Sequence, residues 1–399
     1  MVLLFWESIW YNVFTMKYIK RKIEDEIIRL LPKGKVIVVY GPRQSGKTTM
    51  LQHINKSQNF DALWLDADSL DVRERISAMT PEKWKTILNG KKTLIIDEAQ
   101  RVDGIGLALK ILIDNIKDLQ VIVTGSSAFD LRNKTEESLT GRKFEFLLLP
   151  LSFEEMSAIE SPLEELRTLE TRLIYGSYPE IVFSEGDRER ILTSLTSSYL
   201  YKDVLALDGV AKSSALDKLV RALAFQVGSE VSYQELAGFV GIDRKTVEKY
   251  IDILKRCFVI FELGSYSKNL RNEIKKSHKF YFFDLGIRNA VIGNLLPFSS
   301  RAAEEIGHLW ENYCISERFK LNANLPLPPR IYFWRTKAGQ EVDYLEESAS
   351  GLNAWEIKWN PSKITKSAPS AFRTAYPKAT WNVLTPDDCI DFLTHSIDK

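Results

Sequence analysis

Residues 41–48, GPRQSGKT, fit the phosphate-binding pattern G-x-x-x-x-G-K-[ST] without a mismatch. Glycines in such a turn let successive backbone N–H groups and a helix N-terminus point at one phosphate. The ammonium of Lys47 is suited to the β- and γ-phosphates of a nucleotide, and the hydroxyl of Thr48 is suited to Mg²⁺. The pattern also arises as an ordinary glycine turn, but here an apolar run precedes it and a helical pattern follows.

We therefore predict ATP and Mg²⁺ as cofactors of this chain. The predicted nucleotide-binding residues are consecutive: Gly41, Pro42, Arg43, Gln44, Ser45, Gly46, Lys47, Thr48 and Thr49.

An acidic pair, Asp97 and Glu98, ends a later apolar run, LIID. Asp97 is expected to hold Mg²⁺ through a water, and Glu98 to act as the general base that polarises the attacking water. The other interpretation is that the pair only caps the following helix. Beside an intact phosphate loop, the pair favours hydrolysis over storage of the nucleotide.

Polar residues also follow the next apolar run, VIVTGSS. Thr124 is the first choice for a side chain that contacts the γ-phosphate and the water, and Ser126 is the second. Small polar residues in an ordinary turn are the alternative. Arg142, after a glycine, is a candidate arginine finger acting in its own chain or from a neighbouring subunit. A surface ion pair is the alternative for Arg142.

Near the C-terminus, Asp343 precedes Glu356-Ile-Lys358 on what reads as the next strand. Alternation along that strand puts Glu356 and Lys358 on one face. Asp343 and Glu356 are then candidates to share a Mg²⁺, while Lys358 orients a water or stabilises charge on a phosphate. This pattern is the core of the restriction-endonuclease-like fold, either as an active nuclease or as a degenerate copy that only binds.

Residues 231–254 indicate a helix, a tight turn and a second helix that Asp243 caps. Two apolar strand-like runs follow and flank a basic loop, so we predict a winged helix that contacts DNA. Its candidate DNA-binding residues are Arg244, Lys245, Lys249 and Lys275. The alternative is a packing module whose lysines are only solvated.

The elements that must position these residues alternate in type along the chain. Short apolar runs separated by helical patterns up to about residue 150 predict buried parallel strands with crossover helices. A helical stretch follows to about residue 210, and the last hundred residues contain both helices and strands. At roughly 150 residues per domain, 399 residues predict two or three domains.

Composition narrows the class of protein. With 45% hydrophobic and 27% charged residues the chain is globular, and a net charge of +1 excludes a globally basic nucleic-acid binder but not a local basic patch. Three scattered cysteines disfavour a disulfide framework and fit a reducing cytosol. The apolar start, residues 1–15, is too short and interrupted to span a bilayer, so we expect a misassigned start or a peripheral anchor and a cytoplasmic protein.

Several sequence words then point to a family. In order they are GPRQSGKTT, LIIDEAQ, VTGSSAFDL, LTGRKFEFLLLPLSFEE, YGSYPE and SSYLYKDV. They resemble a group of archaeal and bacterial AAA-type ATPases that carry an uncharacterised C-terminal domain. The resemblance runs from Met16 to about Lys366 and departs at Ser177, where the family more often has a second glycine.

The resemblance implies an α/β protein with four parts: a P-loop AAA-type ATPase core at 16–150, a helical lid at 151–210, a winged helix at 211–285 and a restriction-endonuclease-like domain at 286–399. It also implies Glu311 as a further acidic metal ligand beside Asp343 and Glu356.

From these features we predict an ATP-hydrolysing protein that couples nucleotide state to DNA or a protein partner, with a homo-oligomer as an option. The alternatives are an ATP-regulated, Mg²⁺-dependent nuclease and a slow, non-enzymatic nucleotide switch.

Overall fold

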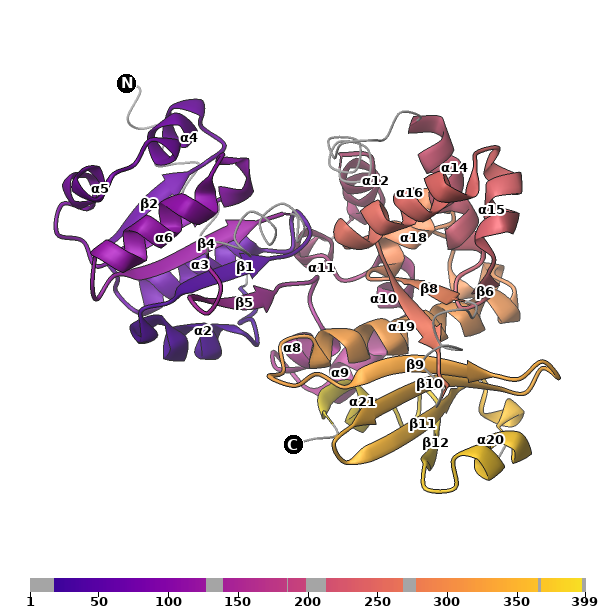
Figure 1. Cartoon of the computed structure of the whole chain (residues 1–399). Helices are drawn as coiled ribbons and strands as arrows, with labels where there is room; N and C mark the ends of the chain where they lie inside the picture. Colours follow the sequence, from indigo (N-terminus) through magenta and orange to yellow (C-terminus); the bar gives the residue numbers. More distant parts are fainter. Residues whose placement is uncertain are drawn as a thin grey trace.

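The computed structural model describes residues 18–126, 139–184, 186–198, 213–267, 278–364 and 367–396. These residues form two packed bodies that lie side by side (Figure 1). The first, coloured indigo to purple, contains a five-stranded sheet, and the second contains a seven-stranded sheet within the described ranges. The described ranges contain no helix with the length and apolar character needed to cross a membrane.

The first sheet is entirely parallel, in the order β2-β3-β4-β1-β5. Its strands are β1 (Val36–Tyr40), β2 (Ala62–Asp66), β3 (Thr93–Asp97), β4 (Gln120–Gly125) and β5 (Lys143–Leu147). The predicted α/β class with buried parallel strands is therefore confirmed. Strand β5 was not predicted, because its alternating KFEFL lacks the continuous apolar run that marks the other buried strands.

Helices cover both faces of this sheet because the strands are apolar on both sides. On one face Ile37 and Val39 pack against Ile27 and Met50 of the helices that flank β1. On the other face the neighbouring valines pack against the remaining helices. These helical elements are α2 (Glu24–Leu30), η1 (Leu31–Lys33), α3 (Lys47–Ser57), α4 (Leu70–Ser77), α5 (Pro81–Leu88), η2 (Ala99–Arg101) and α6 (Ile105–Asn115).

The chain leaves β5 and enters a helical region in the second body. Its helices are α8 (Phe153–Ser157), α9 (Pro162–Arg167), α10 (Leu169–Tyr175), α11 (Pro179–Phe183), α12 (Arg188–Ser198), α14 (Ser213–Phe225), α15 (Tyr233–Val240) and α16 (Arg244–Arg256). The predicted cap of α16 is confirmed, since the Asp243 carboxylate accepts a hydrogen bond from the Thr246 N–H at 3.0 Å. The apolar side chains that recur at helical spacing along α16 are buried in the core: Val247, Tyr250, Ile251 and Leu254.

The second sheet has the order β12-β11-β10-β9-β7-β8-β6. Its strands are β6 (Glu230–Val231), β7 (Ile260–Ser265), β8 (His278–Phe282), β9 (Arg330–Arg335), β10 (Glu341–Ser348), β11 (Gly351–Ile357) and β12 (Thr380–Leu384). Strand β10 is antiparallel to β9 and β11, whereas β7 is parallel to β9 and β11 to β12. The β7–β9 pairing, Gly264 with Tyr332 and Ser265 with Phe333, makes one sheet of the strands before and after residue 285.

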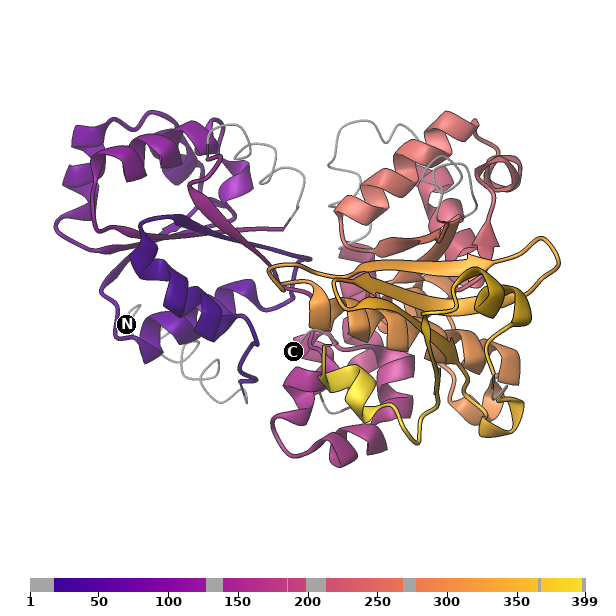
Figure 2. The ribbon, with the colours of Figure 1, turned by 60° about the horizontal axis from the view of Figure 1, so that its bottom comes forward.

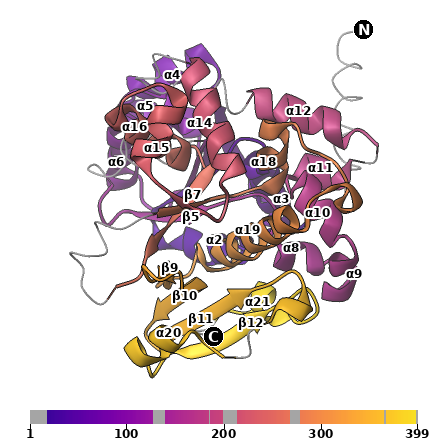
Figure 3. The same ribbon diagram turned by 90° about the vertical axis from the view of Figure 1, so that its right-hand side faces the viewer.

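The remaining helical elements are α18 (Leu285–Ile292), η4 (Phe298–Ser300), α19 (Ala303–Asn322), η5 (Pro361–Lys363), α20 (Ser370–Ala375) and α21 (Ile390–Thr394). The long helix α19 packs against β8, β11 and α21 (Figure 3). Helix α21 returns to α8 at the start of this body (Figure 2). One apolar core consequently runs from Leu149 to Leu393.

Candidate functional site

The phosphate loop connects β1 to α3 at the carboxyl edge of the first sheet. Its first glycine is required by packing, because a Cβ on Gly41 would lie 2.0 Å from the carbonyl oxygen of Leu148. Its second glycine, Gly46, has a φ of +92° and directly precedes α3. The left-handed backbone conformation is about 1–2 kcal/mol less favourable for a residue with a side chain than for glycine. Packing at Gly41 and backbone conformation at Gly46 therefore both favour glycine.

Lys47 is buried at the start of α3 and its ammonium turns back over the loop. Its Nζ donates to the carbonyl oxygens of Gly41 at 2.9 Å and Pro42 at 2.8 Å. A bound phosphate anion would compete for the same ammonium, and it brings a full negative charge that the carbonyls lack. The side chain is thus positioned for the role predicted from the sequence.

Asp97 lies beside the loop because the carboxyl ends of parallel strands share one edge of the sheet. Its Oδ2 accepts a hydrogen bond from the Thr48 hydroxyl at 2.7 Å, and its Oδ1 accepts one from the Thr124 hydroxyl. Strand β4 lies between β1 and β3, which explains why Thr124 reaches the carboxylate. Two adjacent oxygen donors, the Thr48 hydroxyl and the Asp97 carboxylate, suit a Mg²⁺ ion.

Glu98 has a φ of +51°, an uncommon conformation for a residue with a side chain. Its N–H donates to the Thr124 hydroxyl at 3.1 Å, and its carboxylate accepts from the Gln100 amide at 2.5 Å. The same amide nitrogen of Gln100 lies 2.9 Å from the Ser126 hydroxyl. Backbone strain of this kind concentrates at functional sites. Gln100 was not predicted; its place two positions after Glu98 was the available signal.

Arg142 lies at the opposite edge of the sheet. Its carbonyl oxygen accepts from the N–H of Val36, the first residue of β1, so the length of the strand, roughly 13 Å, separates it from the phosphate loop. Its guanidinium pairs with Asp114 at 3.1 Å, and both side chains are exposed by about two fifths. Arg142 does not reach the site of its own chain, which corrects that form of the arginine-finger prediction. Its action from a neighbouring subunit stays a prediction.

The predicted C-terminal residues meet on adjacent strands. Lys358 Nζ lies 3.2 Å from Asp343 Oδ2 and 2.8 Å from Glu356 Oε1. The Ile357 N–H donates to the same oxygen of Asp343 at 2.8 Å. Burial, together with the Asp343 charge, raises the pKa of Glu356. The lysine therefore partly compensates a crowded pair of carboxylates.

Glu311 reaches the same neighbourhood from α19. Its Oε1 accepts from the Tyr281 hydroxyl at 2.6 Å and lies 3.5 Å from Lys279 Nζ. Burial, with the Asp343 charge, raises the pKa of Glu311. Lys279 also pairs with Glu341. Lys279 and Glu341 were not predicted from the sequence. Lys279 stands two positions before Tyr281 on β8, and Glu341 stands two positions before Asp343 on β10.

Among the residues that the structure describes, no group of three His, Cys, Asp or Glu side chains is arranged to hold a metal ion. The metal-ligand role of Glu311, Asp343 and Glu356 stays a prediction, and in this arrangement lysines compensate those carboxylates.

The candidate DNA-binding residues lie on the exposed face of α16. Arg244, Lys245 and Lys249 are exposed, but Arg244 pairs with Glu248 at 2.8 Å. Lys275 lies outside the described residues. The exposed face of α16 therefore mixes acidic with basic side chains.

Ser177, where the chain departs from the family resemblance, is buried in the short segment between α10 and α11. Its N–H donates to Asp284 Oδ2 at 2.7 Å, and its hydroxyl accepts from Lys320 Nζ at 3.0 Å. A glycine at this position would keep the first contact and lose the second.

Three family models match successive parts of the chain. One described as an AAA domain matches residues 33–157. Two described as domains of unknown function, DUF8612 and DUF4143, match residues 166–296 and 306–390. The first match covers the whole of the phosphate site, and the chain carries an AAA domain.

The chain is also similar to proteins of other organisms and to solved structures. An uncharacterized protein of Mycobacterium tuberculosis is 25% identical over 357 residues, covering 88% of this chain and 77% of the relative. An uncharacterized protein of Methanocaldococcus jannaschii is 26% identical over 324 residues, covering 70% of this chain and 66% of the relative. The Walker-type ATPase PABY2304 of Pyrococcus abyssi has a TM-score of 0.47 at 14% identity, covering 69% of this chain and 96% of that one. The RuvB branch migration motor of Thermotoga maritima has a TM-score of 0.31 at 15% identity, covering 64% and 95%.

Proposed function

We propose that this chain binds ATP with Mg²⁺ and hydrolyses it at the carboxyl edge of the first sheet. The observation that carries the proposal is the meeting of Thr48, Asp97 and Thr124 at one point behind the phosphate loop. Three elements far apart in the sequence place these hydroxyl and carboxylate groups together. A glycine turn without nucleotide chemistry has no need of that arrangement.

Each residue has a distinct task in hydrolysis. The loop N–H groups and Lys47 bind the β- and γ-phosphates and orient the terminal phosphoryl group. Thr48 and Asp97 would hold Mg²⁺, which neutralises charge on the phosphate oxygens when bound. Glu98 accepts a proton from the attacking water, and Gln100 and Thr124 hold the acidic pair in position.

The test is phosphate release and nucleotide binding in matched variants. Lys47→Ala should abolish ATP binding, because the ammonium that meets the phosphates is gone. Glu98→Gln should keep binding and slow hydrolysis by roughly 10²–10⁴-fold. The controls are Lys85→Ala and Glu82→Gln on the exposed face of α5. Hydrolysis at the wild-type rate in Glu98→Gln would remove the general-base assignment.

We further propose that the second body contains a winged helix at 211–285 and a restriction-endonuclease-like domain at 286–399, with a helical lid at 151–210. The order α14-β6-α15-α16-β7-β8 supports the first. The gathering of Asp343, Glu356 and Lys358 on adjacent strands supports the second. In this proposal the nucleotide state governs contact with DNA or a protein partner.

Labelled DNA incubated with the protein, Mg²⁺ and ATP tests this second candidate. Cleavage that disappears in Lys358→Ala would support a nuclease. Binding without cleavage, weakened across sequences by Lys245→Ala and Lys249→Ala and less salt-dependent in that variant, would support a binding module. No binding in any nucleotide state would leave a protein partner as the target.

A further inference from the structure

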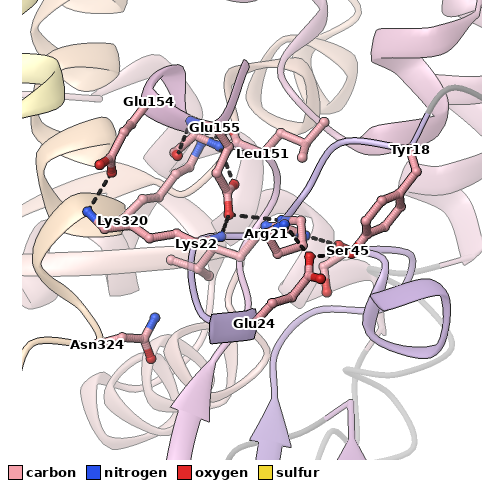
Figure 4. A network of polar contacts seen from close by, with 12 residues as sticks. Tyr18, Arg21, Lys22, Glu24, Ser45, Leu151, Glu154, Glu155, Lys320 and Asn324 are labelled. Carbon is pink, nitrogen blue, oxygen red and sulfur yellow. Dashed lines mark hydrogen bonds and ion pairs between the residues drawn. The ribbon is translucent and has the colours of Figure 1, made fainter. Parts of the chain in front are cut away.

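One buried arginine connects the phosphate loop to the segment through which the chain leaves the first body (Figure 4). Arg21 Nη1 donates to the carbonyl oxygen of Ser45 at 2.7 Å, and Nη2 donates to that of Leu149 at 2.7 Å. Its Nε donates to Glu155 Oε1 at 3.0 Å. With 4% of its surface exposed, Arg21 has each of its three guanidinium nitrogens occupied by protein.

The contact with Ser45 controls the direction of one peptide group. In a trans peptide the C=O and the following N–H point to opposite sides. Since the Ser45 carbonyl points at Arg21, the Gly46 N–H points away from it. Gly46 stands directly before α3, where N–H groups bind phosphate, so Arg21 orients one of the amides of the predicted anion site.

Glu155 in turn holds Arg21. The Glu155 carboxylate also accepts from the N–H of Lys22 at 2.9 Å and the N–H of Ser152 at 3.0 Å. Although burial opposes ionisation, the Arg21 charge and these hydrogen bonds keep the pKa of Glu155 below its usual value. The pair is therefore an ionised, hydrogen-bonded contact inside the protein, where removing one partner is costly.

The segment that carries Glu155 is docked on α19 of the second body. Glu317 accepts from the Phe153 N–H at 2.6 Å, and Lys320 donates to the carbonyl oxygen of Leu151 at 3.1 Å. Asn324 pairs with both backbone groups of Leu147 at 2.8 Å. A continuous set of contacts thus runs from the phosphate loop through Arg21 and Glu155 to α19.

We propose that Arg21 is a positioning residue of the nucleotide site, which sets the Ser45–Gly46 peptide for phosphate binding while the segment 149–155 is docked on α19. The proposal rests on the proposed function, because it assumes that the loop binds ATP. Arg21 itself does not touch the nucleotide. It links the geometry of the loop to the junction between the two bodies.

The experiment measures the Kd of the full chain for a fluorescent ATP analogue with Mg²⁺, and the Tm without nucleotide. Arg21→Ala should weaken binding by about tenfold or more, since a charge-assisted contact to the loop is lost. Arg21→Lys, which keeps the charge but cannot form all three contacts, should fall between that variant and the wild type. Glu155→Gln should weaken binding less, and adding it to Arg21→Ala should have no further effect.

Lys22→Ala is the matched control. Lys22 follows Arg21 in the chain and pairs with Glu154, the neighbour of Glu155, at 2.5 Å, so the change removes a nearby ion pair that does not involve the loop. If Arg21→Ala and Lys22→Ala bind equally well while Lys47→Ala does not bind, the role of Arg21 is refuted and the nucleotide site stands. If Lys47→Ala binds normally, the proposed function itself fails. If Arg21→Ala does not fold, Arg21→Lys decides: a wild-type Kd refutes the role, and a weaker one supports it.

Discussion

Replacing Thr124 by valine tests the geometry of the hydrolytic site most directly. The change keeps the shape of the side chain and removes its hydroxyl from a position with no solvent exposure. Asp97 Oδ1 then loses the hydroxyl donor and keeps only the Glu98 N–H at 3.2 Å, and that N–H loses its second acceptor, the Thr124 hydroxyl at 3.1 Å. The two acidic residues lose the contact that they share.

The expected size follows from the charge on Asp97. A hydrogen bond to a charged group contributes about 1.5–3 kcal/mol. If that stabilisation is lost from the transition state of hydrolysis, the rate falls about 10–100-fold, because about 1.4 kcal/mol corresponds to a tenfold change in rate. ATP affinity should change little, since Lys47 and the loop amides remain.

Steady-state phosphate release at saturating ATP measures the rate, and titration with a fluorescent analogue measures the affinity. Thr124→Ser restores the hydroxyl and should recover most of the rate. Ser126→Ala, which removes only a contact of Gln100, should cost less. A Thr124→Val rate within twofold of wild type, in a folded protein, would show that this hydroxyl does not position the acidic pair.

Other consequences concern stability and reactivity. Arg318→Ala should cost about 3–5 kcal/mol in urea unfolding, because it strands the buried Glu346, which now pairs with Arg318 at 2.7 and 2.9 Å. Burial raises the pKa of Glu262, but the hydrogen bonds from His278 and Lys255 outweigh it and hold this pKa at about 2. Because the pKa of Glu262 is lower in the folded than in the unfolded protein, its ionised form stabilises the fold, and this stabilisation is lost as the pH falls from about 4.5 to about 2. The free energy of unfolding of Glu262→Gln, measured over the same pH range, should lack that loss. Burial raises the pKa of Cys389 to about 12, so Ellman's reagent at pH 8 should label this thiol only after unfolding.

The phosphate site was predictable from the sequence because its chemistry is local. The loop from Gly41 to Thr48 is one continuous segment, and its glycines and lysine are needed whatever the rest of the chain does. Asp97 was predictable for a second reason. Parallel strands end at a common edge, so an acidic residue at the end of a later apolar run must lie near the loop.

The position of Arg142 within the sheet and the ion-pair partners of the C-terminal carboxylates could not be predicted in the same way. Arg142 follows a glycine near the end of the AAA domain, but β5 begins there, which places its side chain at the edge away from the loop. Lys279, which lies beside Glu311, comes from β8, more than 60 positions before Asp343, and no spacing rule links it to this cluster.

The sequence alone therefore determined the α/β class, the phosphate loop and the acidic pair, since each depends on contiguous residues or on a periodic apolar pattern. Only the tertiary structure decided which hydroxyl meets Asp97, where Arg142 lies and that Arg21 holds the loop. Arg21 contacts residues 24, 128 and 134 positions away, and these contacts exist only after separate segments of the chain have packed together. Such contacts depend on how separate elements are brought together, and neighbouring residues in the chain carry no signal of that.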